Sequence, residues 1–244
     1  SEALAFTGEK RPATWTTNSN IKTYGESDPN PLTTGSGNFL GSDGVSATYT
    51  RVSGETVSGG PYAITATLAS SVANALDNYT ITNAGASFTI NKVNSSITAT
   101  GSTSYTYSAS AQGPASSTVT GSTGSVTYSY SGTGSTFYSV SSTAPTNAGT
   151  YQVIASVAED ANFNAATSAA LAFTINKASS SITATGSTSY TYSASAQGPA
   201  LSIVTGSTGS VTYSYSGTGN TSYSASSTAP TNAGTYQVIA SVAE

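Results

Sequence analysis

The 244-residue chain contains no cysteine, no histidine and no methionine, and only 7% of its residues are charged. The absence of cysteine excludes disulfides, thiol catalysis and cysteine-based zinc sites, and the absence of histidine removes the usual general base and the commonest metal ligand. No run approaches the length of a transmembrane helix, and a net charge of −4 gives no electrostatic basis for binding nucleic acid. The sequence therefore predicts a protein that is not an enzyme and has no cofactor and no metal.

Glycine, serine, threonine, tyrosine and alanine dominate the remaining composition, with 24 glycines and 16 tyrosines. Disordered chains usually combine high net charge with few aromatic or β-branched residues, and this chain has the opposite balance. The composition thus favours folded β-structure. Because the first residue is a serine, we expect either a mature chain left by cleavage or a fragment of a longer one.

The N-terminal third predicts one β-module, residues 8–92. We interpret residues 8–20 as a connection, and Ala69–Leu76 as a short helix. Alternating β-branched or aromatic positions predict the strands of this module, which are Val45–Val52, Tyr62–Leu68, Asn78–Ile81 and Ala86–Ile90.

The remainder is a tandem repeat of 85 residues, in which Ile97 corresponds to Ile182 and Glu159 to Glu244. The second module, residues 93–177, ends in the alternating residues Leu171, Phe173 and Ile175. The third module, residues 178–244, has no counterpart of residues 160–177. We therefore predict an all-β chain of small tandem antiparallel modules, sandwich-like or β-grasp-like, of which the last lacks its closing strand and leaves a sheet edge open.

The first seven residues match this closing segment. Ser1–Thr7 reads SEALAFT and Ser168–Thr174 reads SAALAFT, so Leu4 and Phe6 occupy the positions of Leu171 and Phe173. Residues 1–7 are then a strand that belongs to a neighbouring module. One interpretation is a donor strand that fills the open edge of another copy by strand addition. The other is the tail of a preceding repeat in a longer covalent array that has been cut inside a repeat.

Several strings resemble a known family. KTYGESDPNPL, RVSGETVSGGPYAITATL, DNYTIT and ASFTINK in the first module resemble the mirror-β-grasp (MBG) repeats of large bacterial surface adhesins, in the subtype marked by a Tyr-Gly step. YTYSASAQGP and STAPTNAGTYQVIASVAE, found in both later modules, resemble companion repeats described as bacterial immunoglobulin-like. The resemblance implies extracellular, tandemly arrayed β-modules and transfers no ligand or catalytic residue.

Four groups of residues could form functional sites, but each also has a purely structural interpretation. Tyr105, Tyr107, Tyr128 and Tyr130 could form a sugar-stacking platform, but alternating tyrosines on facing strands more often pair across a sheet. Calcium could bind near Glu26 and Asp28 or near Glu159 and Asp160, but without the usual loop spacing these are solvated turn carboxylates. Lys92 and Lys177 could form isopeptide links, although exposed strand-end lysines fit better. Paired glycosidase carboxylates could come from Glu26, Asp28, Asp43, Glu55 and Asp77, yet nothing places two of them together.

These observations predict a structural subunit of an extracellular bacterial filament or adhesin stalk on the cell surface. It would assemble head to tail by inserting its N-terminal strand, anchored by Leu4 and Phe6, into the incomplete C-terminal module. Its partners would be other copies of itself or adjacent repeats, with no nucleic acid and no membrane span. The alternatives are a carbohydrate-binding adhesin module with a glycan partner, and a fragment of a longer covalent repeat array.

Overall fold

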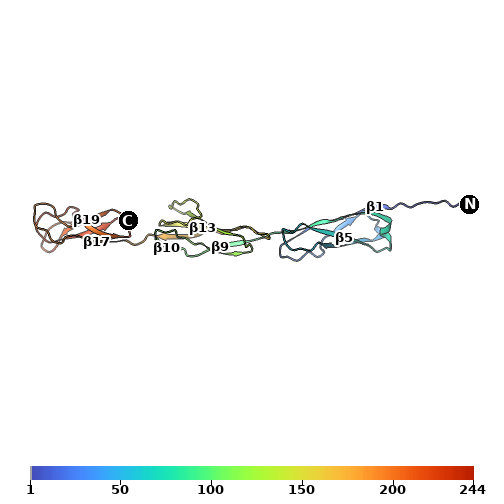
Figure 1. The fold of residues 1–244 in the computed structure, drawn as a ribbon, viewed down its shortest axis with the longest axis horizontal. Helices are drawn as coiled ribbons and strands as arrows, with labels where there is room; N and C mark the ends of the chain where they lie inside the picture. The colour runs from blue at the N-terminus through green and yellow to red at the C-terminus, as the bar shows by residue number, and fades with distance from the viewer. Residues whose placement is uncertain (1) are drawn as a thin grey trace. The chain divides into compact units, whose positions relative to one another are not determined.

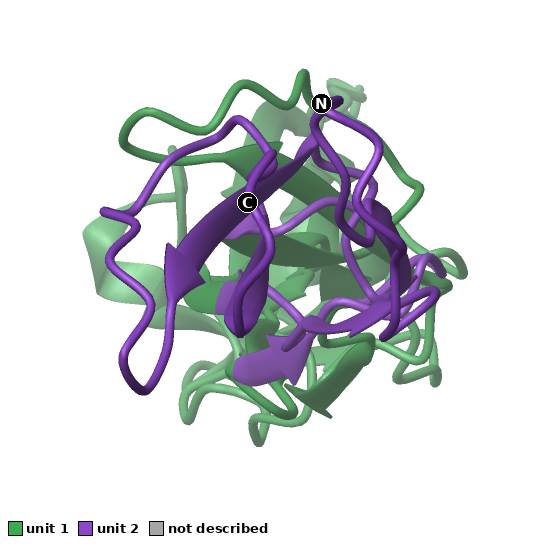
Figure 2. Ribbon diagram, turned by 90° about the vertical axis from the view of Figure 1, so that its left-hand side faces the viewer, with its two compact units in different colours: residues 1–103, 113–145, 150–173 green, residues 104–112, 146–149, 174–244 purple. Residues whose placement is uncertain are grey.

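The computed structural model describes residues 2–244, so Ser1, the first position of the segment 1–7, lies outside the described residues. The chain divides into two compact units, which Figure 2 colours separately. Unit 1 comprises residues 1–103, 113–145 and 150–173, and unit 2 comprises residues 104–112, 146–149 and 174–244. Both units are built from small β-sheets, which confirms the predicted all-β fold of tandem modules (Figure 1).

The first module forms two sheets. In one, β1 (Arg11–Thr17) lies between β3 (Gly35–Gly37) and β6 (Tyr79–Ala84). The other has the order β2-β7-β5-β4, made of β2 (Asn20–Thr23), β7 (Ala86–Asn91), β5 (Tyr62–Ser70) and β4 (Val45–Arg51). The core follows the expected alternation, because Tyr62 and Ile64 on β5 pack with Phe88 and Ile90 on β7.

Two predictions for this module are wrong. Residues 8–20 are not a plain connection, since β1 buries Ala13 and Trp15 and pairs parallel with β6. Pro12 argued against a strand in the sequence, because proline has no N–H to donate to a neighbouring strand. In the structure β3 pairs only with residues 15–17 of β1, so this pairing does not need an N–H from Pro12. Ala69–Leu76 is not a helix either. There β5 continues to Ser70, whose hydroxyl accepts the Val72 N–H at 3.0 Å and forms a turn, before the short 3-10 helix η2 (Ala75–Asn78).

The second module has a main sheet with the strand order β10-β16-β13-β12, and β15 pairs with the end of β13. Along β13 the side chains of Tyr151, Val153, Ala155 and Val157 are buried in strict alternation, as predicted. The strands of this module are β8 (Val93–Asn94), β9 (Ser96–Thr100), β10 (Ser104–Thr106), β11 (Ser116–Thr120), β12 (Val126–Gly132), β13 (Gly149–Val157), β14 (Phe163–Asn164), β15 (Ala166–Thr167) and β16 (Leu171–Asn176).

The third module repeats part of this arrangement. Strand β17 (Ser181–Thr185) pairs with β18 (Leu201–Thr205), and β19 (Val211–Gly217) pairs with β20 (Tyr236–Val242), in the same registers as β9 with β11 and β12 with β13. Residues 189–191, the counterpart of β10, form no strand in the described structure. The inward side chains of β20 are only half-buried, whereas their counterparts on β13 are buried. The sheet is thus unfinished, as predicted from the missing closing segment.

The sheets differ from the prediction in one respect, because they mix antiparallel and parallel pairs. Strand β2 pairs parallel with β7, and β10 pairs parallel with β16. In each case an early strand of a module lies beside the strand that closes it. Period-two patterning identifies strands but carries no information about the direction of their neighbours, so the sequence could not reveal this.

Candidate functional site

The closing strand has the same role in the first two modules. Two alternate side chains of each closing strand are buried, with exposed fractions of 0% for Phe88 on β7 and 1% for Ile175 on β16, while the inward residue before them is half-buried. Beyond the parallel pair, the Tyr24 N–H donates to the Asn91 carbonyl at 2.9 Å, and the Tyr107 N–H donates to the Asn176 carbonyl at 2.8 Å. The closing strand therefore supplies core side chains and fixes an early strand in both modules.

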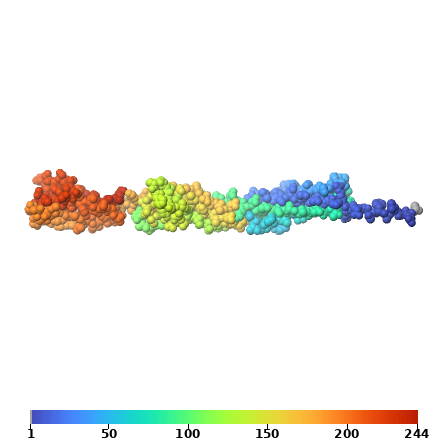
Figure 3. Space-filling view, turned by 90° about the horizontal axis from the view of Figure 1, so that it is seen from above, coloured from blue at the N-terminus to red at the C-terminus, as the bar shows by residue number. Residues whose placement is uncertain are grey.

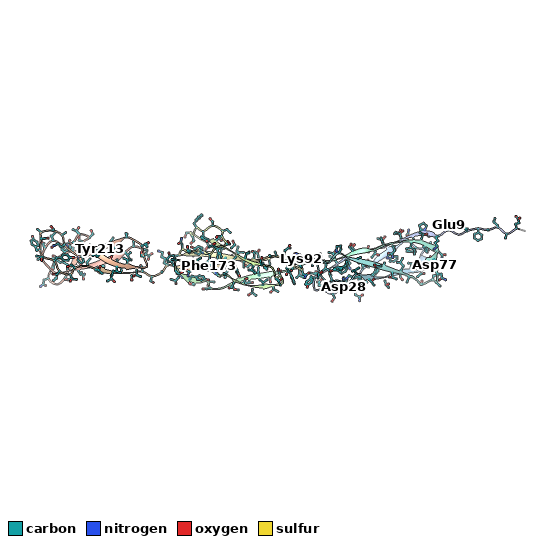
Figure 4. The ribbon with its side chains drawn as sticks, viewed as in Figure 1. Glu9, Asp28, Asp77, Lys92, Phe173 and Tyr213 are labelled. Atoms are coloured by element: carbon teal, nitrogen blue, oxygen red, sulfur yellow. The ribbon has the colours of Figure 1, made fainter. Side chains whose placement is uncertain are left out.

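Phe173 is the aromatic centre of the second module. Its ring stacks on Tyr151 with centroids 5.5 Å apart at an interplanar angle of 26°, and meets Tyr130 edge-on at 6.2 Å and 86°. Tyr138 in turn packs edge-on against Tyr151 at 5.9 Å. Aromatic pairs in such geometries add about 0.5–1.5 kcal/mol each beyond area burial. Phe173, labelled in Figure 4, thus joins the rings of β12 and β13 into one cluster.

In the third module the corresponding region is an open groove of about 540 Å³. The Tyr215 hydroxyl donates to the Pro199 carbonyl at 2.9 Å, as that of Tyr130 does to Pro114 in the second module. The Tyr215 side of the groove is therefore held as its counterpart is in the complete module. We call this hollow the open groove. The residues that line it include Tyr190, Tyr192, Gly198, Tyr215, Tyr236 and Val238.

The N-terminal segment lies outside any strand in the described residues. Leu4 and Phe6 are 92% and 91% exposed, an unusual condition for two large apolar side chains so close in sequence. In Figure 3 the described residues of this segment are coloured dark blue, and Figure 4 labels Glu9, which follows the segment in the chain. Insertion of Leu4 and Phe6 into another copy remains a prediction.

A charged cluster in the first module was missed by the sequence analysis. The side chains of Lys22 and Arg51 are only 4% and 7% exposed. Arg51 donates to both oxygens of Asp28, at 2.6 and 2.8 Å, and also binds Glu55. Lys22 lies 2.9 Å from Asp28 and also pairs with Glu55. The local sequence carried no signal for it, because on the strand Asn20–Thr23 the structure buries Lys22 and exposes the apolar Ile21.

The cluster holds the loop that begins at Tyr24 and Gly25 and contains Asp28 against the core of the first module. The Arg51 guanidinium lies over the rings of Phe88 and Tyr62, 4.9 and 5.4 Å from their centroids. Hydrogen bonds from Arg51 and Lys22 lower the pKa of Asp28 to about 2, against the opposing effect of burial. Asp28 is therefore an ion-paired group and not the solvated turn carboxylate that we expected.

This pairing also bears on catalysis and metal binding. Asp28 and Glu55 do come together, through the two cations between them, but the pKa of each is lowered, chiefly by Arg51 for Asp28 and by Lys22 for Glu55. A glycosidase general acid needs a raised pKa instead. Glu26 accepts the Thr23 N–H at 2.9 Å. Within residues 2–244, no group of three or more acidic side chains is placed to hold a metal ion.

The loop after Glu159 connects the first two modules within unit 1. Asp160 accepts N–H groups from Thr123, Asn162 and Phe163 at 2.8–2.9 Å, and these bonds lower its pKa to about 2. These bonds hold the loop, which lies against the first module. There Asn162 Oδ1 accepts the Val57 N–H at 3.1 Å, and the Phe163 ring meets the Tyr24 ring edge-on with their centroids 5.6 Å apart.

The two strand-end lysines take part in a repeated pairing. Lys92, labelled in Figure 4, binds Glu159 at 2.9 Å, and Lys177 binds Glu244 at 2.6 Å. Both pairs join residues 67 positions apart. Each lysine therefore has a glutamate partner, which agrees with the interpretation as strand-end lysines and gives no support to an isopeptide link.

The four candidate tyrosines of the second module form no common platform. Tyr130 is buried, and its hydroxyl donates to the Pro114 carbonyl. The Tyr128 hydroxyl bonds Ser117 at 3.1 Å, while Tyr107 is exposed beside the closing strand. These positions agree with the structural interpretation of the tyrosines as parts of the sheet.

Among the described residues, no helix is long and apolar enough to cross a membrane. Comparison with known families gives two matches. Residues 13–89 match the MBG domain of the YGX type, and residues 95–179 match a second MBG domain, in the region for which we expected an immunoglobulin-like module. No curated protein and no solved structure matches the chain. MBG domains are structural repeat modules of surface adhesin-like proteins, and this chain, with two of them in tandem, belongs to the MBG-domain family.

Proposed function

We propose that the chain is a structural subunit of an extracellular filament or adhesin stalk, made of modules 8–92, 93–177 and 178–244. Subunits join head to tail when residues 1–7 of one copy enter the open groove of another. The observation that carries this proposal is the 540 Å³ groove at the place where β16 completes the preceding module. The proposed occupant has nearly the same sequence as the start of that strand.

The geometry of the second module supports one mode of insertion. The donor strand would lie between residues 189–191 and β20, parallel to the former, as β16 lies between β10 and β13. Leu4 and Phe6 would then face inward like Leu171 and Phe173. Main-chain hydrogen bonds would supply affinity and the two inward side chains specificity. Because donor and acceptor are different surfaces, the contact is heterologous and gives an open filament.

The rest of the chain fits a spacer placed outside the cell. Beyond Lys92 only Glu159, Asp160, Lys177 and Glu244 are charged, which leaves little to steer a charged ligand. Three of these four form the repeated lysine–glutamate pairs, and Asp160 holds its own loop. The charged residues of the later modules thus form contacts within the chain.

Electron microscopy and sedimentation velocity of the purified chain test the proposal. We expect filaments from the unaltered chain and monomers from the double variant Leu4→Ser/Phe6→Ser. The matched control is Ala5→Ser, since Ala172, its counterpart on β16, is exposed and the change should leave filaments intact. Monomers from all three chains, or filaments from all three, would refute strand insertion. The first result would favour the covalent repeat array, in which the closing strand follows in the same polypeptide.

A second candidate function rests on the same groove. Its lining includes the tyrosines 190, 192, 215 and 236 together with Gln197 and Asn232, and such rings and amides can bind sugars. The filled groove of the second module favours a strand over a glycan as the occupant. A glycan array decides the matter if it is run with and without excess peptide of residues 1–10. Glycan signals without any binding of the peptide would support the carbohydrate-binding alternative, whereas the absence of glycan signals would contradict it.

A further inference from the structure

We infer that the open groove selects its strand through a phenylalanine pocket, formed by Gly198, Tyr215 and Tyr236, that takes the ring of Phe6 from a second copy. The inference deepens the proposed function and rests on it. It assigns the recognition to one side chain and predicts which residues the pocket rejects. The second module supplies the template, because Gly113, Tyr130 and Tyr151 are the counterparts of the three pocket residues and surround Phe173.

The first step is the glycine. A β-carbon added at Gly113 would lie 3.1 Å from Cζ of Phe173 and 2.9 Å from Cε1 of Tyr130. The phenylalanine ring therefore fits because residue 113 has no side chain. At Gly198 a β-carbon would lie 2.7 Å from Cε1 of Tyr215. A side chain at residue 198 would displace the tyrosine or occupy the space of the incoming ring.

The second step is that both aromatic walls are already held in the third module. The Tyr236 hydroxyl donates to the Asn232 carbonyl at 2.8 Å. Its ring meets Tyr223 edge-on at 5.8 Å and 89°, nearly the geometry of Tyr138 and Tyr151 in the second module. Tyr215 is fixed through its bond to Pro199. The walls thus need little rearrangement to receive a ring, which lowers the ordering cost of binding.

The third step concerns which side chain fits. Among the ring atoms of Phe173, Cζ lies nearest to the place where a β-carbon at residue 113 would be, so we expect little room for a hydroxyl group on Cζ. It would also need a hydrogen-bond partner in a buried site. Phe6→Tyr, conservative on a protein surface, should therefore be rejected. Phe6→Leu fits but gives up the two ring contacts, and Phe6→Ala leaves the pocket empty.

Peptide binding to the full chain tests the inference. The acceptor is the Leu4→Ser/Phe6→Ser chain, which has no donor of its own, and the probe is a fluorescent peptide of residues 1–10 followed by anisotropy. We expect binding of the native peptide, a loss of at least 30-fold for Phe6→Ala, a loss of about 10-fold or more for Phe6→Tyr, and a smaller loss for Phe6→Leu, which fits the pocket. The acceptor variant Gly198→Val should abolish binding, whereas Ala196→Val, at an exposed position nearby, should not.

The outcomes separate the two levels of the argument. If the native peptide does not bind at all, the proposed strand insertion fails. If it binds and the phenylalanine variants bind equally well, insertion stands and the aromatic pocket is wrong. Circular dichroism shows whether Gly198→Val folds. If Gly198→Val unfolds, the series of peptides with different residues at position 6 still tests the pocket, because these peptides bind to an acceptor whose groove is unaltered.

Discussion

The proposed donor strand departs from the native closing strand at one core position. Gly8 aligns with Ile175, which is 1% exposed in the second module. The donor thus presents two inward anchors where β16 presents three. Replacing Gly8 with isoleucine should supply the third. Fully burying an isoleucine side chain is worth about 1.5–3 kcal/mol.

Two corrections to this magnitude act in opposite directions. Ordering the isoleucine side chain costs about 0.5–1 kcal/mol, whereas removing a glycine from a strand recovers a similar amount of backbone entropy. The two corrections nearly cancel, so a net gain of about 1.5–3 kcal/mol remains, which corresponds to roughly 10- to 150-fold tighter binding. The gain should come from slower dissociation, as for most changes within one interface.

The assay compares peptides of residues 1–10 that carry the native glycine, Gly8→Ile or Gly8→Ser, with the donor-less full chain as acceptor. The serine peptide controls for the loss of glycine flexibility without adding apolar area. Equal affinities for the isoleucine and serine peptides would refute the reasoning, because they would mean that position 8 does not reach the core of the acceptor module.

Three further predictions concern the modules themselves. Arg51→Ala should destabilise the first module by about 1.5–3 kcal/mol in denaturant unfolding because it removes the hydrogen bonds to Asp28 and the packing over Phe88 and Tyr62 while Lys22 still pairs with Asp28, and Arg51→Met should cost less because it retains the packing. Because the folded pKa of Asp28 is about 2 against an ordinary 3.8, the stability it contributes is complete above about pH 5 and is lost as the pH falls toward 2; a melting series should show this loss, and Asp28→Asn should remove its share. Tyr151→Ala should cost about 3–5 kcal/mol, and the matched Tyr236→Ala at least 1 kcal/mol less, since Tyr236 is only half-buried; equal losses would contradict an open groove.

The sequence allowed much of this fold to be predicted, because period-two burial is a local property. Four strands of the first module, β4 to β7, and the alternation along β13 were visible from β-branched and aromatic residues alone. Strand β1 was not, because its residues are small or polar apart from Trp15 and include a proline. Its burial depends on β6, more than 60 residues later, and no local pattern reports such a partner.

The candidate site divides in the same way. The groove could be anticipated from the repeat, since the third module is a near copy of the second and has no counterpart of residues 160–177. The Lys22–Arg51 cluster could not, because its four members are spread over 34 positions and meet only through the fold. Gly198 was equally hidden. A glycine in a glycine-rich chain has no distinguishing pattern until a ring is found beside its counterpart.

The parallel pairing of the closing strand determines how a module responds to tension. The chain enters the first module through β1, which pairs parallel with β6, and leaves it through β7, which pairs parallel with β2. A pull on both ends slides each of these end strands along its parallel neighbour, so the ladder bonds resist together in shear and do not open one after another. A donor strand inserted parallel to residues 189–191 would be loaded in the same way. A junction without any covalent bond between subunits could thus withstand pulling as the modules do.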